Sequence, residues 1–146
     1  MANVIYRGPV AKEPQTINLP VAGAYLPGTF VTSDGDELTQ ATDADAKVYL
    51  LGNRRFMEQG LDDAYEEDDT AVAYEVLPGE RYQARMAAAT YTKGDALTVG
   101  AAGRLAAAAT AGDNIVAYFD GSTGAVTAGA LADVIIANGY TVPAAT

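Results

Sequence analysis

Short runs rich in Val, Ile, Tyr and Thr recur along most of this chain, and each is bounded by Gly, Asp or Asn. Runs of this length and composition are typical of β-strands joined by tight turns, and they leave little room for a stable helix. Seven such runs follow residue 28: Thr29–Thr32, Lys47–Leu51, Thr70–Leu77, Glu80–Ala87, Ala96–Val99, Asn114–Phe119 and Ala132–Ala137. The pattern predicts an all-β (mainly β) protein, a small β-barrel or β-tulip-like domain with at most short helices.

Three local features refine this prediction. The segment Ala71–Ala87 is predicted to form a hairpin, because apolar residues alternate on both sides of the central Pro78-Gly79 turn. A short helical turn is expected over Arg54–Gln59, with Asn53 as its N-cap and Gly60 as its stop. The alanine run 106–109 favours helix by propensity. Nearby glycines leave too little room for one, so a strand is expected there.

The first 27 residues differ from the rest of the chain. Four of the six prolines of the chain fall here, and they keep the segment extended. Its two bases and one acid give it a charge of +1, against −11 for residues 28–146. We therefore predict an extended N-terminal arm, residues 1–27, and a β-barrel-like domain, residues 28–146.

The arm has two interpretations. In one, Val4–Tyr6 and Thr16–Leu19 are edge strands of a loosely packed terminus. In the other, the arm adds itself to a partner's surface through backbone hydrogen bonds and a few anchoring side chains. The candidate anchors in this second interpretation are Val4, Ile5, Tyr6, Arg7 and Lys12.

A weak internal repeat aligns residues 28–49 with residues 94–116. Gly28 and the strand after it correspond to Gly94 and the strand after it, at an offset of 66 that becomes 67 further on. Each copy contains a glycine, a short strand, a Gly- or Asp-rich turn, a second strand, a loop and a third strand. Two copies would build the two halves of a small barrel, although shared β composition alone also produces similarity of this size.

The composition excludes much of the usual chemistry of enzymes. The chain contains no His and no Cys, so it has no imidazole base, thiolate nucleophile or Cys-based metal site. We expect no catalytic residues, no cofactor and no metal ligands. The formal charge of −10 argues against nucleic acid and anionic membranes as partners, because both bind clustered Lys and Arg.

The apolar content is dominated by small side chains. Thirty of the residues are Ala and only three are Phe, so a monomer is short of large apolar side chains to bury. Oligomerisation would supply the missing burial. No signal peptide and no membrane-spanning segment is expected, since residues 1–20 lack the charged and apolar regions and the apolar runs are short.

An acidic cluster is the densest charged feature of the sequence. It places six carboxylates within eight residues: Asp62, Asp63, Glu66, Glu67, Asp68 and Asp69. Oxygen ligands at this density can hold Ca²⁺ or Mg²⁺, but the spacing is not that of an EF-hand loop. A solvated acidic loop between strands is the favoured interpretation. The glycine-rich segments 100–103 and 121–124 lack the Lys-Ser/Thr of phosphate loops and are interpreted as turns.

One stretch carries a resemblance to a known family. The run Tyr91–Val99, followed by Gly103-Arg104-Leu105 and by Asn114–Tyr118, resembles the head decoration (capsid cement) proteins of tailed bacteriophages. Upstream, residues 64–72 are similar to that family's approach to a strand, with Asp68 in place of a Gly. The resemblance covers residues 60–138, and no site residue carries over from it.

The resemblance implies a structural virion protein without catalysis. Such a protein would be made in the host cytoplasm and would bind the outer capsid surface as a homotrimer. Its partners would be the major capsid protein and further copies of itself, and its arm would reach the capsid.

Two alternatives remain open from the residues. One is a carbohydrate-binding or adhesin-like β-module that uses exposed tyrosines such as Tyr65 or Tyr91. The other is a carboxylate- or metal-dependent hydrolase in which Asp68 and Asp69 take part.

Overall fold

The computed structural model describes residues 4–9, 12 and 14–143, and it is all-β, with antiparallel sheets. The described strands are β1 (Thr16–Pro20), β2 (Phe30–Ser33), β3 (Leu38–Gln40), β4 (Tyr49–Leu51), β5 (Thr70–Tyr74), β6 (Arg81–Arg85), β7 (Ala89–Tyr91), β8 (Ala96–Val99), β9 (Leu105–Ala107), β10 (Asn114–Phe119), β11 (Gly124–Val126) and β12 (Leu131–Thr141). The helical elements are short 3-10 turns such as η2 (Arg55–Met57) and η3 (Ala101–Gly103). The predicted fold class is confirmed.

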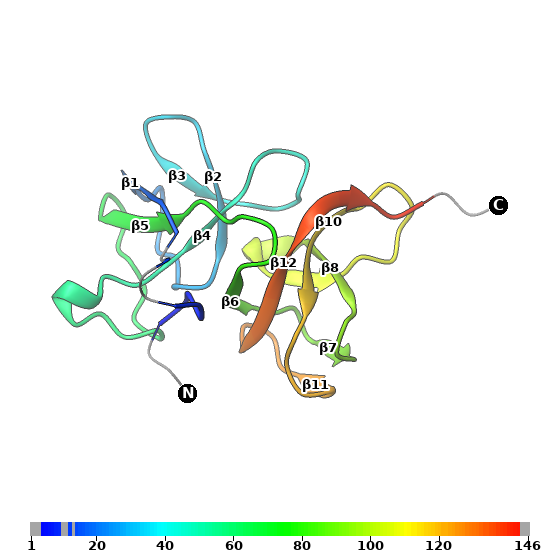
Figure 1. Ribbon diagram of the computed structural model, residues 1–146. Coiled ribbons are helices and arrows are strands. Elements are labelled where there is room, and N and C mark those ends of the chain that lie inside the picture. The colour runs from blue at the N-terminus through cyan, green and yellow to red at the C-terminus, as the bar shows by residue number, and fades with distance from the viewer. Residues whose placement is uncertain (1–3, 10–11, 13, 144–146) are drawn as a thin grey trace.

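The strands form two five-stranded sheets and one small ribbon. The first sheet has the order β1-β5-β4-β2-β3, the second has the order β6-β12-β10-β8-β9, and β7 pairs with β11. Figure 1 shows the first sheet in the left half of the molecule and the second in the right half. Residues 16–74 therefore build one unit, and residues 81–141 build the other.

The two units repeat one topology. Counted along the chain, the first, fifth, fourth, second and third strands of the first sheet correspond in order to β6, β12, β10, β8 and β9. Each sheet closes on itself through one parallel bridge, Val21 with Leu38 in the first unit and Met86 with Leu105 in the second. The offsets of these bridge residues, 65 and 67, lie within one residue of the offsets of 66 and 67 found in the sequence repeat. The internal repeat is thus confirmed at the level of strand order, and it extends beyond the aligned residues.

The predicted hairpin over Ala71–Ala87 is wrong, although both of its strands exist. The turn forms, since Glu80 N donates to the Leu77 carbonyl at 3.2 Å. However, β5 lies between β1 and β4 in the first sheet, whereas β6 pairs with β12 in the second. Alternation of apolar residues identifies a strand but not its partner, and β5 already has a partner on each edge. The segment from 75 to 80 is therefore the connection between the two units.

One apolar core joins the units. The larger cluster combines Phe30, Leu50 and Tyr74 of the first unit with residues of the second such as Tyr82 and Leu97. A smaller cluster lies within the first unit and includes residues that follow or form its strands: Val21, Val31, Leu38, Leu51, Tyr65, Ala71 and Ala73. No helix among the described residues is long and apolar enough to cross a membrane.

The segment predicted as an arm lies against both units. Strand β1 pairs with β5 inside the first sheet, and its Ile17 and Leu19 pack against the smaller cluster. Ile5 and Tyr6 belong to the larger cluster, and Tyr6 forms an isolated bridge with Tyr82 of β6. The predicted boundary between residues 27 and 28 therefore falls inside the first unit, because apolar burial draws β1 into the sheet.

Candidate interaction surface

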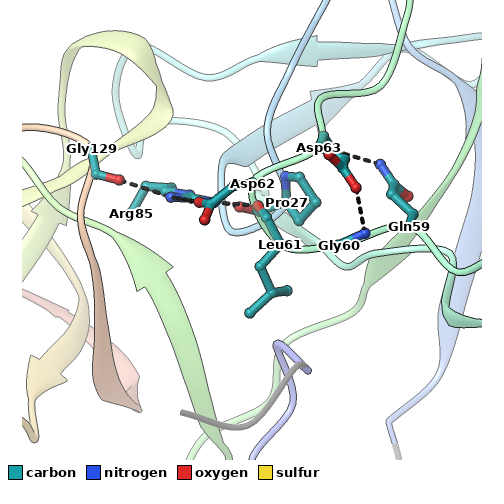
Figure 2. A network of polar contacts seen from close by, with 8 residues as sticks. All are labelled: Pro27, Gln59, Gly60, Leu61, Asp62, Asp63, Arg85 and Gly129. Carbon is teal, nitrogen blue, oxygen red and sulfur yellow. Dashed lines mark hydrogen bonds and ion pairs between the residues drawn. The ribbon is translucent and has the colours of Figure 1, made fainter.

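A buried arginine ties the acidic segment to both units (Figure 2). The Arg85 side chain, on β6, is only 7% exposed. Its Nε donates to the Pro27 carbonyl at 2.9 Å and its Nη1 to the Gly129 carbonyl at 3.1 Å. Its Nη2 donates to the Leu61 carbonyl and lies 3.3 Å from Asp62 Oδ1. The N–H groups of the guanidinium are therefore used to hold these loops together.

The acidic cluster is a folded loop whose aspartates bond the backbone. Asp63 accepts from Gly60 N at 2.9 Å, and Gln59 Nε2 donates to the Asp63 carbonyl at 2.9 Å (Figure 2). Asp69 accepts from Glu66 N at 2.9 Å and pairs with Arg54 Nη2 at 3.1 Å.

The other carboxylates of the cluster, those of Glu66, Glu67 and Asp68, are exposed. Within the described part of the chain, no three acidic side chains converge as they would around a metal ion. Five of the six acids of the cluster are exposed and Asp69 is half-buried, which is the solvated arrangement that the sequence favours.

Two apolar side chains next to the acidic loop protrude from the surface. Asn53 Nδ2 donates to the Gln59 carbonyl at 2.8 Å, and Gln59 Oε1 accepts from Arg54 N at 2.8 Å. This clamp closes a loop around η2, and Phe56 and Met57 on that turn are 78% and 61% exposed. Exposed apolar side chains held on a rigid turn are a feature of protein interaction sites.

The predicted helical turn over Arg54–Gln59 is therefore a 3-10 turn of three residues, Arg55–Met57. Asn53 does not serve as its N-cap, since Arg54 takes that position and no side chain caps it. The Asn53 side chain is instead bonded to the far end of the loop, at Gln59. The turn stays short because Glu58 adopts a left-handed conformation, with φ of 58°.

Two depressions flank Phe56. The larger, of about 530 Å³, lies between the turn and the outer face of β1 and β5, where Thr16, Val72 and Tyr74 line it. The smaller, of about 240 Å³, has Asn18, Met57 and Thr70 in its wall. Phe56 and Val72 line both. We call Phe56, Met57 and these two depressions the Phe56 surface.

The structure separates the five candidate anchors of the N-terminal segment. Ile5 is fully buried and Tyr6 nearly so, and Val4 is half-buried. Arg7 and Lys12 are exposed, and Arg7 Nη1 lies 3.7 Å from Asp133 Oδ1. The apolar anchors are therefore used by the chain itself, and the two basic residues are the ones open to a partner.

The tyrosines singled out for sugar stacking are not on the surface. Tyr65 and Tyr91 are buried, and burial raises the pKa of both hydroxyl groups. Tyr65 Oη donates to the Gly52 carbonyl at 2.6 Å, and Tyr91 Oη donates to the Ala87 carbonyl at 2.7 Å. Neither ring offers a face to a ligand.

Sequence reasoning missed the Phe56 surface. An apolar pair, Phe56-Met57, stands between Arg55 and Glu58 in the segment predicted to be a short helical turn. That pair was the available signal, but the depressions beside it are created by strands from elsewhere in the chain. The chain matches no protein-family model and no curated protein sequence.

Proposed function

We propose that this chain is a structural protein of a virion, a decoration or cement protein that binds the outside of an icosahedral phage head as a homotrimer and stabilises it. The observation that carries the proposal is the Phe56 surface, where Phe56 and Met57 stand exposed on a hydrogen-bonded turn beside two depressions. The resemblance of residues 91–118 to head decoration proteins points to the same class.

The use of the buried polar groups supports a structural role. Arg85, a buried charged side chain, bonds three backbone carbonyls that come from separate loops. In the same way, the Asn53 side chain bonds the Gln59 carbonyl and the Gln59 side chain bonds the backbone N of Arg54, and these two bonds close the loop between them. Polar groups of this kind hold a surface in shape, which is what a binding module requires.

Stabilisation of the head would follow from mass action. A protein that binds only the assembled shell stabilises it by RT ln(1 + [L]/Kd) at each site, and the effect is repeated over the many sites of the shell. Three linked copies engaging at once add avidity. Trimer formation would also bury apolar surface at the subunit contacts, and so supply burial that an alanine-rich monomer lacks.

Two parts of the molecule would contact the shell in this proposal. The Phe56 surface supplies apolar contact, and the exposed Arg7 and Lys12 supply positive charge on a chain that is otherwise acidic. Ile5 and Tyr6 hold the base of this basic segment to the body of the protein.

The test begins with the mass in solution. Light scattering should give three times the 15.1 kDa of one chain, and a monomer would contradict the proposal. The second step is co-sedimentation with heads that lack the protein, taken from a deletion mutant of the phage that encodes it. Phe56→Ser should weaken attachment by about tenfold or more, as expected for a central apolar contact.

Matched variants complete the experiment. Leu77→Ser removes a side chain that is 60% exposed outside the Phe56 surface, so it should attach as the unmodified protein does. Arg7→Glu combined with Lys12→Glu should weaken attachment in a salt-dependent manner. If the unmodified protein does not sediment with heads at all, the proposal is wrong.

A further inference from the structure

The two units differ at one edge strand. β1 and β6 are equivalent, since each is the first strand of its unit and each lies at the end of its sheet. In the first unit, Val21 N donates to the Asp69 carbonyl at 3.0 Å. In the second unit, Met86 N donates to the Ala130 carbonyl at 2.9 Å. Val21 and Met86 are 65 residues apart, so residues of the two strands can be compared one by one.

The outer edge of β6 is covered by the chain itself. Bonded pairs alternate along an antiparallel ladder, so every second residue of β6 turns its backbone groups away from β12. The Arg81 carbonyl accepts from Arg7 N at 2.8 Å, and Gln83 N donates to the Ile5 carbonyl at 2.7 Å. The side chain of Gln83 adds a bond to the Val4 carbonyl at 2.8 Å. Residues 4–7 thus act as a short strand laid along β6.

The equivalent edge of β1 is open. At the offset of 65, the counterparts of Arg81 and Gln83 are Thr16 and Asn18. Their backbone groups point away from β5, and within the described ranges none of them meets a partner. The edge is used again only at Ala22, whose N–H donates to the Leu38 carbonyl at 2.9 Å.

We propose that the open edge of β1 is a docking site for one extended segment of a partner protein, which adds to the first sheet as an antiparallel strand. Its backbone would donate to the Thr16 carbonyl and accept from Asn18 N, as residues 7 and 5 do on β6. An open, unpaired strand edge is a template for such pairing.

Side chains on both faces of the edge indicate what the segment carries. Its central residue would lie opposite Ile17, as Tyr6 lies opposite Tyr82. Ile17 and Leu19 are only half-buried, so an apolar or aromatic residue there would complete their burial. The residues on either side would share the face of Thr16 and Asn18 and would point toward the depressions beside Phe56.

The acidic residues near the end of β1 indicate where the added segment would carry basic residues. In an antiparallel arrangement the N-terminal end of the added segment lies near the end of β1, where Asp68 N donates to the Val21 carbonyl at 2.9 Å. The exposed acids Glu66, Glu67 and Asp68 stand at that end. A segment with basic residues before its apolar centre therefore fits best. The source of the segment, a shell-forming protein, rests on the proposed function, whereas the docking itself does not.

A synthetic peptide tests the docking. The probe is two lysines followed by Asn-Val-Ile-Tyr-Arg-Gly, the sequence of residues 3–8, added to the full ¹⁵N-labelled chain. We expect the amide signals of Thr16 and Asn18 to shift when the peptide is present, and the hydrogen exchange of the Asn18 N–H, which gains a hydrogen bond, to slow. Shifts confined to β6 would mean that the peptide only displaces residues 4–7, and this outcome would overturn the proposal.

Two proline variants make the test specific. Asn18→Pro removes the outward donor without touching the bonds that Ile17 and Leu19 direct to β5, and it should weaken the peptide at least tenfold. Ala107→Pro is the matched control, because Ala107 lies on the edge strand β9 with its backbone directed away from β8. It should bind the peptide as before. If Asn18→Pro does not fold, the exchange measurement on the unmodified chain still decides.

Other outcomes identify other occupants. Concentration-dependent shifts of Thr16 and Asn18 without peptide would mean that a second copy occupies the edge, and the proposal would be wrong. Replacing the two lysines by glutamates should weaken binding, and no change would refute the charge argument. Peptide binding without attachment to heads would reject the proposed function alone, and attachment without peptide binding would reject the docking alone.

Discussion

At the scale of single residues, the buried polar side chains do more to organise this protein than the exposed charges. Arg85 bonds carbonyls on both sides of the junction between the units, whereas the pair of Arg81 with Asp120 lies at the surface. Breaking the interactions of a buried ion lowers the free energy of unfolding far more than breaking those of an exposed ion. The two arginines lie on the same strand, so they form a natural comparison.

Replacing Arg85 should destabilise the protein strongly. Arg85→Met leaves the carbonyls of Pro27, Leu61 and Gly129 without their donor, and we expect a loss of about 3–5 kcal/mol. Urea unfolding followed by circular dichroism measures it. Arg81→Met, whose side chain is 56% exposed, should cost less than about 1 kcal/mol. Equal losses in the two variants would contradict this account.

The buried tyrosines predict a loss of stability in alkali. Burial, with a hydrogen bond to Glu80, raises the pKa of Tyr82 above the 10.0 of a free tyrosine. The folded state therefore keeps its proton where the unfolded state has lost it. This contribution is complete below about pH 10 and is lost as the pH rises further, toward the raised pKa.

Urea midpoints measured from about pH 8 to about pH 11 should fall above pH 10. The fall should be shallower in Tyr82→Phe, which cannot ionise. A variant as steep as the unmodified protein would show that Tyr82 is not responsible.

At the scale of elements, the N-terminal segment is the part whose role changed most. Its extended form follows from its prolines, but its Ile5 side chain fills the core and its backbone completes the edge of β6. A covered edge is protected from unwanted pairing. The segment is therefore part of the folded body and not only a tether.

Shortening its buried side chain should destabilise the whole protein. Ile5→Ala removes a fully buried side chain, and we expect a loss of about 2–5 kcal/mol in urea unfolding. The exposed Lys12→Ala should change stability by about 0.5 kcal/mol or less. If Ile5→Ala is as stable as the unmodified protein, the segment does not contribute to the core in solution.

At the scale of the whole molecule, two repeated units behave as one body because they share a core and a close backbone contact. Gly103, at the end of η3 in the second unit, packs against Phe30 of the first. A Cβ at Gly103 would lie 2.5 Å from the Phe30 carbonyl oxygen and 2.6 Å from Thr29 Cγ2. Gly103 and the two residues that it contacts therefore lie where the two units meet.

A pair of glycine variants isolates this contact. Gly103 and Gly112 both have positive φ, 63° and 92°, but a Cβ at Gly112 would meet no atom within 4 Å. Gly112→Ala should cost about 1–2 kcal/mol for backbone strain alone. Gly103→Ala should cost about 1–3 kcal/mol more, because the units must also move apart. Thermal unfolding of both variants measures the difference, and equal costs would exclude a tight junction.

The local character of the chain was readable from its residues. Period-two alternation and turn residues identified β8 and β10 to the residue, and the shared pattern of residues 28–49 and 94–116 indicated the duplication. These signals are local or repeat at a nearly fixed offset, so they can be recognised in the sequence alone.

Strand pairing, burial of the N-terminal segment and the Phe56 surface were decided only by the tertiary structure. The residues of β5 and β6 alternate as a hairpin would, yet each strand found neighbours from distant parts of the chain. Ile5 and Phe56 both belong to short apolar runs of the sequence, and one is buried while the other is exposed. Sequence alone determined that this chain forms short strands and indicated a repeat, and the strand order of the folded chain established the two similar units. Which edges are covered depends on contacts between residues far apart in sequence, and such contacts exist only once the chain has folded.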